Sequence, residues 1–268
     1  MTGRSRRLAA AAALSLVVAV TFALVLTVTQ TSSSSSPSPP ASGSRERVLP
    51  AGPKAAFTIP EPTPLEAAGV SRWATVERSA VARRTPGGRH VASLSATTPE
   101  GTSNLVTVLG RAKRLSGALW VRVRLPVLPN NSTGWVPRRA LGGYRTVDTR
   151  LVVDRRRLKA ELFKGDRRIF STGVGVGRPQ WPTPAGRFYI RVKLTSYKSP
   201  FYGPLAFGTS ARSAVLTDWP AGGFVGIHGT DQPEILPGRV SHGCVRMANE
   251  AILKLGRLMP VGTPVTIT

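Results

Sequence analysis

The chain has 268 residues, with 37 Lys and Arg against 13 Asp and Glu, which gives a formal net charge of +24. The length allows one large domain or two small ones, and the 27 glycines and 23 prolines favour short strands and turns over long helices. The basic residues are spread along the chain and are not interleaved with stacking aromatics, so the sequence argues against nucleic-acid binding and favours a solvated basic surface.

An apolar segment lies close to the N-terminus. Arg4, Arg6 and Arg7 precede residues 8–28, which carry no charge and are long enough to span a bilayer. No clear cleavage site of small residues follows, and the apolar run is longer than that of a secretory signal. We therefore predict a signal anchor over residues 1–30, with the arginines inside and the rest of the chain outside the cytoplasm. Cleavage would instead make the protein secreted.

Residues 31–69 are rich in Ser and Pro and poor in apolar residues. Such a composition cannot bury enough surface to fold, so the sequence predicts an extended linker. It would hold the folded part away from the membrane.

Residues 70–145 contain short β-rich pieces separated by turn signals. Strands are expected at residues 76–81, 105–109, 119–125 and 134–137, with a turn at residues 85–88. Val121, Val123 and Leu125 alternate with arginines, as in a half-buried strand. The ending at residues 133–141 resembles a bacterial SH3-type domain. The resemblance implies a small β-barrel that either binds peptidoglycan or acts as a spacer. Asn131 is expected at a polar hairpin tip.

Residues 146–268 are also expected to be mainly β. Strands are predicted at residues 151–154, 158–163, 169–176, 188–194 and 265–267, with a hairpin turn at Gly165. One helix is predicted at residues 249–258, where Ile252, Leu253 and Leu255 would form the apolar face and Asn249 the N-terminal cap.

The single cysteine, Cys244, is the main candidate for chemistry. Exported proteins use cysteines mainly in pairs, so a lone thiol is informative. A buried structural cysteine would have apolar neighbours, whereas Cys244 follows Ser241, His242 and Gly243. We favour a nucleophile that needs a base to take its proton. His228 is the preferred base because a separate strand can aim it freely, and His242 is the second choice.

Two further interpretations concern the same segment. The amides of Gly243 and Cys244 precede the predicted helix and would stabilise a developing oxyanion. A zinc site formed by His228, His242 and Cys244 is the rival, but it lacks a clear fourth ligand and has an uncommon spacing. We therefore disfavour a metal site.

The segments at residues 227–230 and 241–247 together resemble the signature of the YkuD-type L,D-transpeptidases. Residues 173–175 and 183–188 are similar to a hairpin region of that family, so the resemblance covers about residues 146–268. It implies a catalytic β-sandwich domain with one short helix. Pro237 departs from the pattern, because many relatives have a glycine there.

The resemblance also implies roles for individual residues. Cys244 would be the nucleophile and His228 its base, oriented by the main-chain carbonyl of Gly229. Arg246 would bind a substrate carboxylate or brace the loop. The residues that match structural and oxyanion positions are Ser241, His242 and Gly243.

The implied reaction is acyl transfer on peptidoglycan stem tetrapeptides, which requires no metal or organic cofactor. The bond from the L-centre of the diamino acid to the terminal D-alanine would break, an acyl-thioester would form, and an amine would resolve it into a 3-3 cross-link or a wall attachment. The alternatives are an L,D-carboxypeptidase-type hydrolase and a non-catalytic peptidoglycan-binding protein. The expected partners are stem peptides, the anionic cell wall and, through the N-terminal segment, the membrane.

Overall fold

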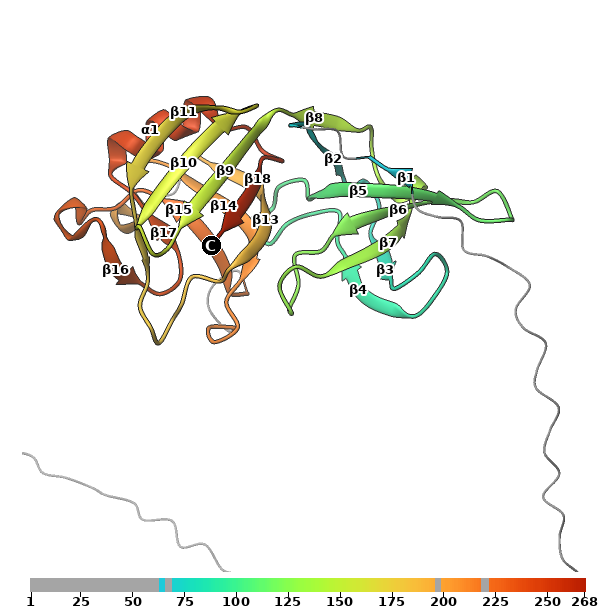
Figure 1. The fold of residues 1–268 in the computed structure, drawn as a ribbon. Helices are drawn as coiled ribbons and strands as arrows, with labels where there is room; N and C mark the ends of the chain where they lie inside the picture. The colour runs from blue at the N-terminus through green and yellow to red at the C-terminus, as the bar shows by residue number, and fades with distance from the viewer. Residues whose placement is uncertain (1–62, 66–68, 196–198, 218–221) are drawn as a thin grey trace, which may run out of the picture. The chain divides into compact units, whose positions relative to one another are not determined.

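Two β-sheets organise the computed structural model, which describes residues 63–65, 69–195, 199–217 and 222–268 (Figure 1). These residues all belong to one compact unit, Ala55–Thr268. The predicted anchor and nearly all of the predicted linker lie outside the described residues. No helix in the described ranges is both long and apolar enough to cross a membrane.

The first sheet is antiparallel, with the strand order β4-β3-β7-β6-β5-β2-β8 and β1 paired to β5. Its interior consists of small and branched apolar residues, and Val121 and Val123 are fully buried while the intervening Arg122 is exposed. The predicted alternation is therefore confirmed. The strands are β1 Thr63–Pro64, β2 Ser71–Thr75, β3 Ala80–Arg83, β4 His90–Leu94, β5 Leu105–Lys113, β6 Leu119–Arg124, β7 Thr133–Pro137 and β8 Arg145–Val147.

One strand prediction in this sheet is wrong in its position. Val76 forms only an isolated bridge with Leu141, and β3 begins at Ala80. The predicted turn at residues 85–88 is present, where the Gly88 amide donates to the Thr85 carbonyl. The likeness to an SH3-type barrel and the predicted domain boundaries remain predictions.

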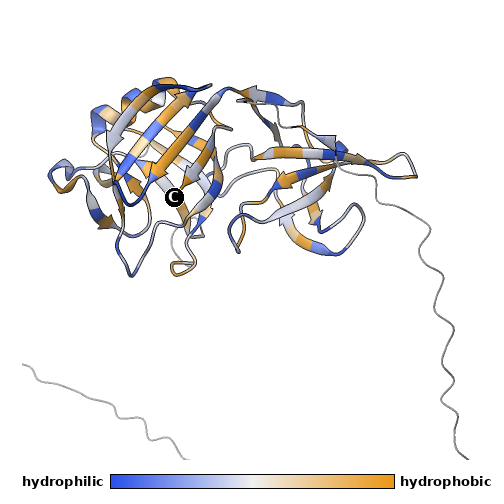
Figure 2. Ribbon diagram, viewed as in Figure 1, coloured by the Kyte–Doolittle hydropathy of each residue, from blue (hydrophilic) through white to orange (hydrophobic). Residues whose placement is uncertain are grey.

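The second sheet is mixed, with the strand order β11-β10-β9-β18-β13-β14-β15-β17-β12-β16. Figure 2 shows apolar residues along the strands of both sheets. The strands are β9 Thr149–Asp154, β10 Lys159–Lys164, β11 Arg167–Gly173, β12 Gly175–Gly177, β13 Gly186–Leu194, β14 Ala206–Arg212, β15 Phe224–His228, β16 Gly238–Ser241, β17 Val245–Arg246 and β18 Pro264–Ile267. Short 3-10 turns lie at Arg138–Ala140, Pro200–Tyr202 and Pro233–Ile235.

Helix α1, Asn249–Leu258, is the single α-helix of the described residues and has the predicted bounds. Ile252 and Leu255 are fully buried in the core of the second sheet. Leu253 was predicted to share this apolar face, but it is 40% exposed. The mainly β fold with one helix is therefore confirmed, whereas the membership of Leu253 in the buried face is wrong.

The prediction that Asn249 caps α1 is also wrong. Ala248 occupies the N-cap position, and the helix has no side-chain cap. The Oδ1 atom of Asn249 accepts a hydrogen bond from the Thr230 amide at 3.0 Å instead. Asn249 therefore links the helix to the segment that follows β15, the strand that carries His228.

Hydrogen bonds connect the two sheets, together with the ion pair between Arg191 and Glu100. Asn130 donates through Nδ2 to the Arg212 carbonyl at 2.7 Å and accepts through Oδ1 from the Arg212 amide at 3.0 Å. Asn131, predicted as a polar hairpin tip, accepts from the Arg187 amide at 2.7 Å. The loop before β7 is therefore fastened to strands β13 and β14.

Candidate active site

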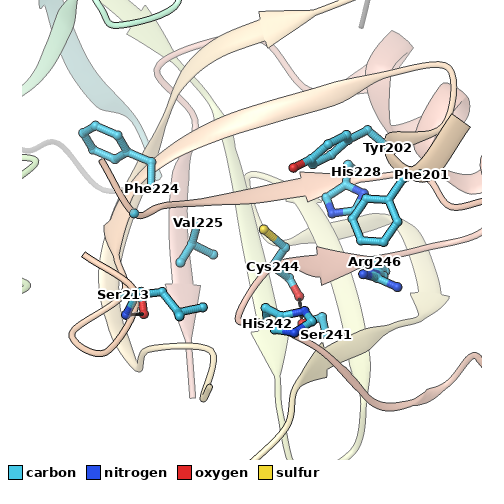
Figure 3. A pocket seen from close by; sticks show the side chains of 12 residues that line it. Phe201, Tyr202, Ser213, Phe224, Val225, His228, Ser241, His242, Cys244 and Arg246 are labelled. Atoms are coloured by element: carbon cyan, nitrogen blue, oxygen red, sulfur yellow. Dashed lines mark hydrogen bonds between the residues drawn. The ribbon is translucent and has the colours of Figure 1, made fainter. Parts of the chain in front are cut away.

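Neighbouring parallel strands bring His228 and Cys244 together. β15 pairs with β17 so that His228 lies opposite Arg246, and Cys244 immediately precedes β17. A methyl group on Gly226 would lie 3.8 Å from both Cys244 Sγ and His228 Cδ2. The thiol and the imidazole therefore line the same cavity (Figure 3).

His228 is held in one tautomer. Its Nδ1 atom lies 2.6 Å from the Gly229 carbonyl oxygen. Because a carbonyl only accepts hydrogen bonds, Nδ1 must carry the proton, and Nε2 keeps a lone pair. The Nε2 atom is buried and has no hydrogen-bond partner among the described residues. Burial, opposed by the Gly229 contact, lowers the pKa of His228 to about 4. The imidazole is therefore neutral at pH 7 and available as a base.

Cys244 rests as a thiol. Burial raises the pKa of the Cys244 thiol, and this effect outweighs a hydrogen bond from the Gly226 amide and the nearby charge of Arg246. The Gly226 amide lies 3.3 Å from Sγ. Since a thiol is a weak nucleophile, any attack by Cys244 would require removal of its proton.

Ser241 and Gly243 shape the turn that presents the thiol. The Ser241 hydroxyl donates to the Cys244 carbonyl at 2.6 Å and accepts from the Gly243 amide at 3.1 Å. Gly243 has a φ of 115°, which a residue with a Cβ adopts only under strain. The Gly243 amide is thus engaged within the turn, which indicates a supporting role. The Cys244 amide remains the predicted oxyanion donor.

Thr183 fastens this turn to β12. Its buried hydroxyl accepts from the Gly177 amide and donates to the Gly243 carbonyl, both at 2.8 Å. His242 packs against Trp181, with ring centroids 4.2 Å apart. The structure therefore places His242 at the cavity wall, tilted against an aromatic ring. In His228 the Nε2 atom has no hydrogen-bond partner among the described residues. Thr183 belongs to a segment that the sequence identified, but its contacts with Gly177 and Gly243 had no local signal.

Arg246 lies on the His228 side of the cavity. Its guanidinium carbon is 4.2 Å from the Phe201 ring centroid, and the buried Nε atom has no hydrogen-bond partner within the described residues. The Tyr202 ring centroid is 4.7 Å from that of His228. Arg246 therefore offers a cationic donor beside an aromatic wall, which suits a carboxylate.

The cavity at the thiol is narrow, with a volume of about 30 Å³. It admits the reacting atoms but not a whole peptide. The sequence did not identify Phe201, Tyr202, Ser213 or Phe224 as lining residues. The first three lie far from the motif in the chain, and Phe224, at the start of β15, carries no local signal of its place in the cavity. The described residues contain no group of three or more His, Cys, Asp and Glu side chains arranged for a metal.

Comparisons with known proteins identify the family. The L,D-transpeptidase catalytic domain, YkuD, matches residues 148–267. The putative L,D-transpeptidase YkuD of Bacillus licheniformis is 32% identical over 129 residues, which cover 47% of this chain and 71% of that protein. The chain belongs to the YkuD family of L,D-transpeptidases. The putative L,D-transpeptidase YqjB of Bacillus subtilis is 35% identical over 106 residues, which cover 35% of this chain and 57% of that protein.

Solved structures give matches of similar extent. A crystal structure of an Enterococcus faecium L,D-transpeptidase has 29% identity and a TM-score of 0.36, covering 45% of this chain and 49% of that chain. An NMR structure of the catalytic domain from the E. faecium enzyme has 27% identity and a TM-score of 0.35, covering 45% and 96%. The YkuD match begins at the start of the second sheet, so the first sheet lies outside it.

Proposed function

We propose that this YkuD-family protein is a peptidoglycan L,D-transpeptidase in which Cys244 is the nucleophile and His228 the general base. The observation that carries the proposal is the tautomer of His228. With Nδ1 bound to the Gly229 carbonyl, the unpartnered Nε2 faces the cavity that also holds Cys244 Sγ. A neutral imidazole beside a thiol is the arrangement that nucleophilic catalysis by cysteine needs.

In the first half-reaction, His228 Nε2 takes the thiol proton as Sγ attacks the carbonyl between the diamino acid L-centre and D-alanine. The Cys244 amide donates to the developing oxyanion. Collapse breaks the C–N bond, and the proton on Nε2 passes to the departing D-alanine nitrogen. The product is an acyl-thioester with a neutral His228.

In the second half-reaction, the amine of another stem attacks the thioester. His228 Nε2 takes one amine proton, the C–S bond breaks, and the proton returns to Sγ. A new amide bond results, and the enzyme regains its starting state. Water in place of the amine would give hydrolysis, so the acceptor decides between a cross-link and a shortened stem.

Charge supports the substrate class. The stem peptides carry carboxylates, the chain carries a formal net charge of +24, and Arg246 presents a cation within the thiol cavity. We assign Arg246 to a carboxylate of the first peptide, whose carbonyl is attacked. The protein would act outside the cytoplasm on the cell wall, held there by the predicted N-terminal anchor.

Mass spectrometry of the full chain incubated with a tetrapeptide stem fragment or a carbapenem tests the proposal. We expect a covalent adduct on the wild type that maps to Cys244, accompanied by free D-alanine when the peptide is used. The Cys244→Ala protein is the control and should remain unmodified. A wild type without adduct, or an adduct that persists in Cys244→Ala, refutes the acyl-enzyme.

A further inference from the structure

A second cavity of about 410 Å³ lies where the first sheet meets β13, β14 and β15. The residues that line it include two arginines and no acid, together with several hydroxyl and amide side chains. We call it the arginine groove, and its lining residues are Ser93, Leu94, Ser95, Thr97, Thr98, Pro99, Asn104, Pro126, Val127, Arg191, Arg212 and Phe224.

Arg191 and Arg212 both contact one aromatic ring. Their guanidinium carbons lie 3.8 Å and 4.9 Å from the Phe224 ring centroid. Arg191 is 2% exposed, and its Nη2 atom lies 3.3 Å from Oε2 of Glu100. Arg212 donates through Nη2 to the Gly222 carbonyl. Glu100 thus pairs with Arg191, whereas the Arg212 guanidinium contacts a main-chain carbonyl, which leaves a net positive charge beside the groove.

These arginines keep unused hydrogen-bond donors. Nε and Nη1 of Arg191, and Nε of Arg212, are buried without a partner among the described residues. A buried donor left unpaired is costly, and a charged donor more so. Guanidinium donors are satisfied best by a carboxylate or a phosphate. The groove is therefore built to receive an anion.

The groove adjoins the thiol cavity. Phe224 lines both, and Ser213, which lines the thiol cavity, follows Arg212 in the chain. Figure 3 shows Phe224 and Ser213 on one side of Cys244, with His228, Phe201, Tyr202 and Arg246 on the other. Cationic groups thus flank the thiol on two sides, Arg246 on one and the arginine groove beyond Phe224 on the other.

We propose that the arginine groove binds a carboxylate of the acceptor peptide, the peptide whose amine resolves the thioester on Cys244. The proposal rests on the proposed function, which needs two carboxylate-bearing peptides at one thiol. Arg246 serves the first peptide, so the second requires another cationic site. Phe224 lines both the groove and the thiol cavity, so a peptide held in the groove would pass this residue to reach the thioester.

Binding to Cys244→Ala proteins tests the groove without any turnover. A stem tetrapeptide with free carboxylates and its fully amidated form are titrated by calorimetry. In the Arg212→Gln background the preference for the free carboxylates should fall about tenfold, the worth of one charge-assisted hydrogen bond. Arg212→Lys should keep part of the preference. Arg122→Gln, which removes an exposed arginine outside the groove, is the matched control and should leave the preference unchanged.

An equal loss of affinity for both peptides, or an unchanged preference in Arg212→Gln, overturns the proposal. Urea unfolding of each variant identifies any that are misfolded, and the same titration of Arg212→Lys then decides. Kinetics with Cys244 intact assign the peptide: KM for the acceptor should rise in Arg212→Gln relative to KM for the donor. A rise for the donor alone also overturns the proposal. If no acyl-enzyme forms, the proposed function is refuted. The binding titrations can still be interpreted, because they need no turnover.

Discussion

Acidification should destabilise the protein through His228. The ordinary pKa of a histidine is 6.5, and burial lowers that of His228 to about 4. Above pH 6.5 the imidazole is neutral in both the folded and the unfolded chain and has no effect on stability. Between pH 6.5 and pH 4 the unfolded chain takes up a proton that the folded chain does not, so the free energy of unfolding falls. Below pH 4 both states are protonated and the loss is complete.

The size of this loss follows from the difference between the two pKa values. One pKa unit is worth about 1.4 kcal/mol, so lowering the pKa from 6.5 to about 4 corresponds to a loss of about 3 kcal/mol. That is a large part of the stability of a typical domain, which is about 5–15 kcal/mol. The effect should therefore be measurable against the titration of the other groups.

Urea unfolding at a series of pH values from 8 to 4 measures the effect. His228→Gln removes the titrating group, so the difference in unfolding free energy between wild type and variant isolates the contribution of His228. We expect the wild type to lose about 3 kcal/mol relative to the variant across this range. His90→Gln, at an exposed position of β4, shows what loss of a surface histidine does. A difference that is constant with pH, or that favours the wild type on acidification, would refute the reasoning.

Three other expectations concern the same cavity. Gly226→Ala should fold, because the contacts of the added methyl group would be 3.5 Å or longer. The methyl group beside Cys244 Sγ should slow acylation at least tenfold in stopped-flow assays, and an unchanged rate contradicts this. Thr183→Val should cost about 1–3 kcal/mol in urea unfolding, because it leaves two buried main-chain groups unpaired, whereas Thr183→Ser should restore most of it. Alkylation of Cys244 by iodoacetamide should be slow at pH 7 and should accelerate with pH, because burial raises the pKa of the thiol; a rate already maximal at pH 7 would show an ion pair instead.

Local patterns predicted those elements whose own residues determine them. The alternation at Val121 and Val123 gave the buried face of β6, and the apolar spacing in α1 gave its bounds. The cysteine and histidine segments pointed to the active site because chemistry restricts which residues can stand there. Each of these signals lies within one short segment of the chain.

Contacts between distant segments could not be predicted in this way. The Asn130 side chain bonds to the main chain of Arg212, and Asn131 bonds to that of Arg187, although both asparagines look like ordinary turn residues. Asn249 is of a residue type that commonly caps helices, but its Oδ1 atom accepts a hydrogen bond from the Thr230 amide instead. In each case a partner supplied by the tertiary fold outweighed the local preference of the residue.

The charge of Arg246 lowers the pKa values of both Cys244 and His228, with opposite consequences for their charged forms. It lowers the pKa of the Cys244 thiol, which favours the thiolate, and it lowers the pKa of His228, which disfavours the imidazolium. These effects largely cancel for a proton moving from Sγ to Nε2, so Arg246 does little to form an ion pair at rest. The Gly226 amide favours the thiolate over the thiol. The Gly229 carbonyl accepts from Nδ1 of the neutral ring and binds the imidazolium more strongly, which raises the pKa of His228. The main-chain contacts of two glycines therefore support the charge-separated state, and in the proposed reaction Arg246 would act on negative charge of the substrate.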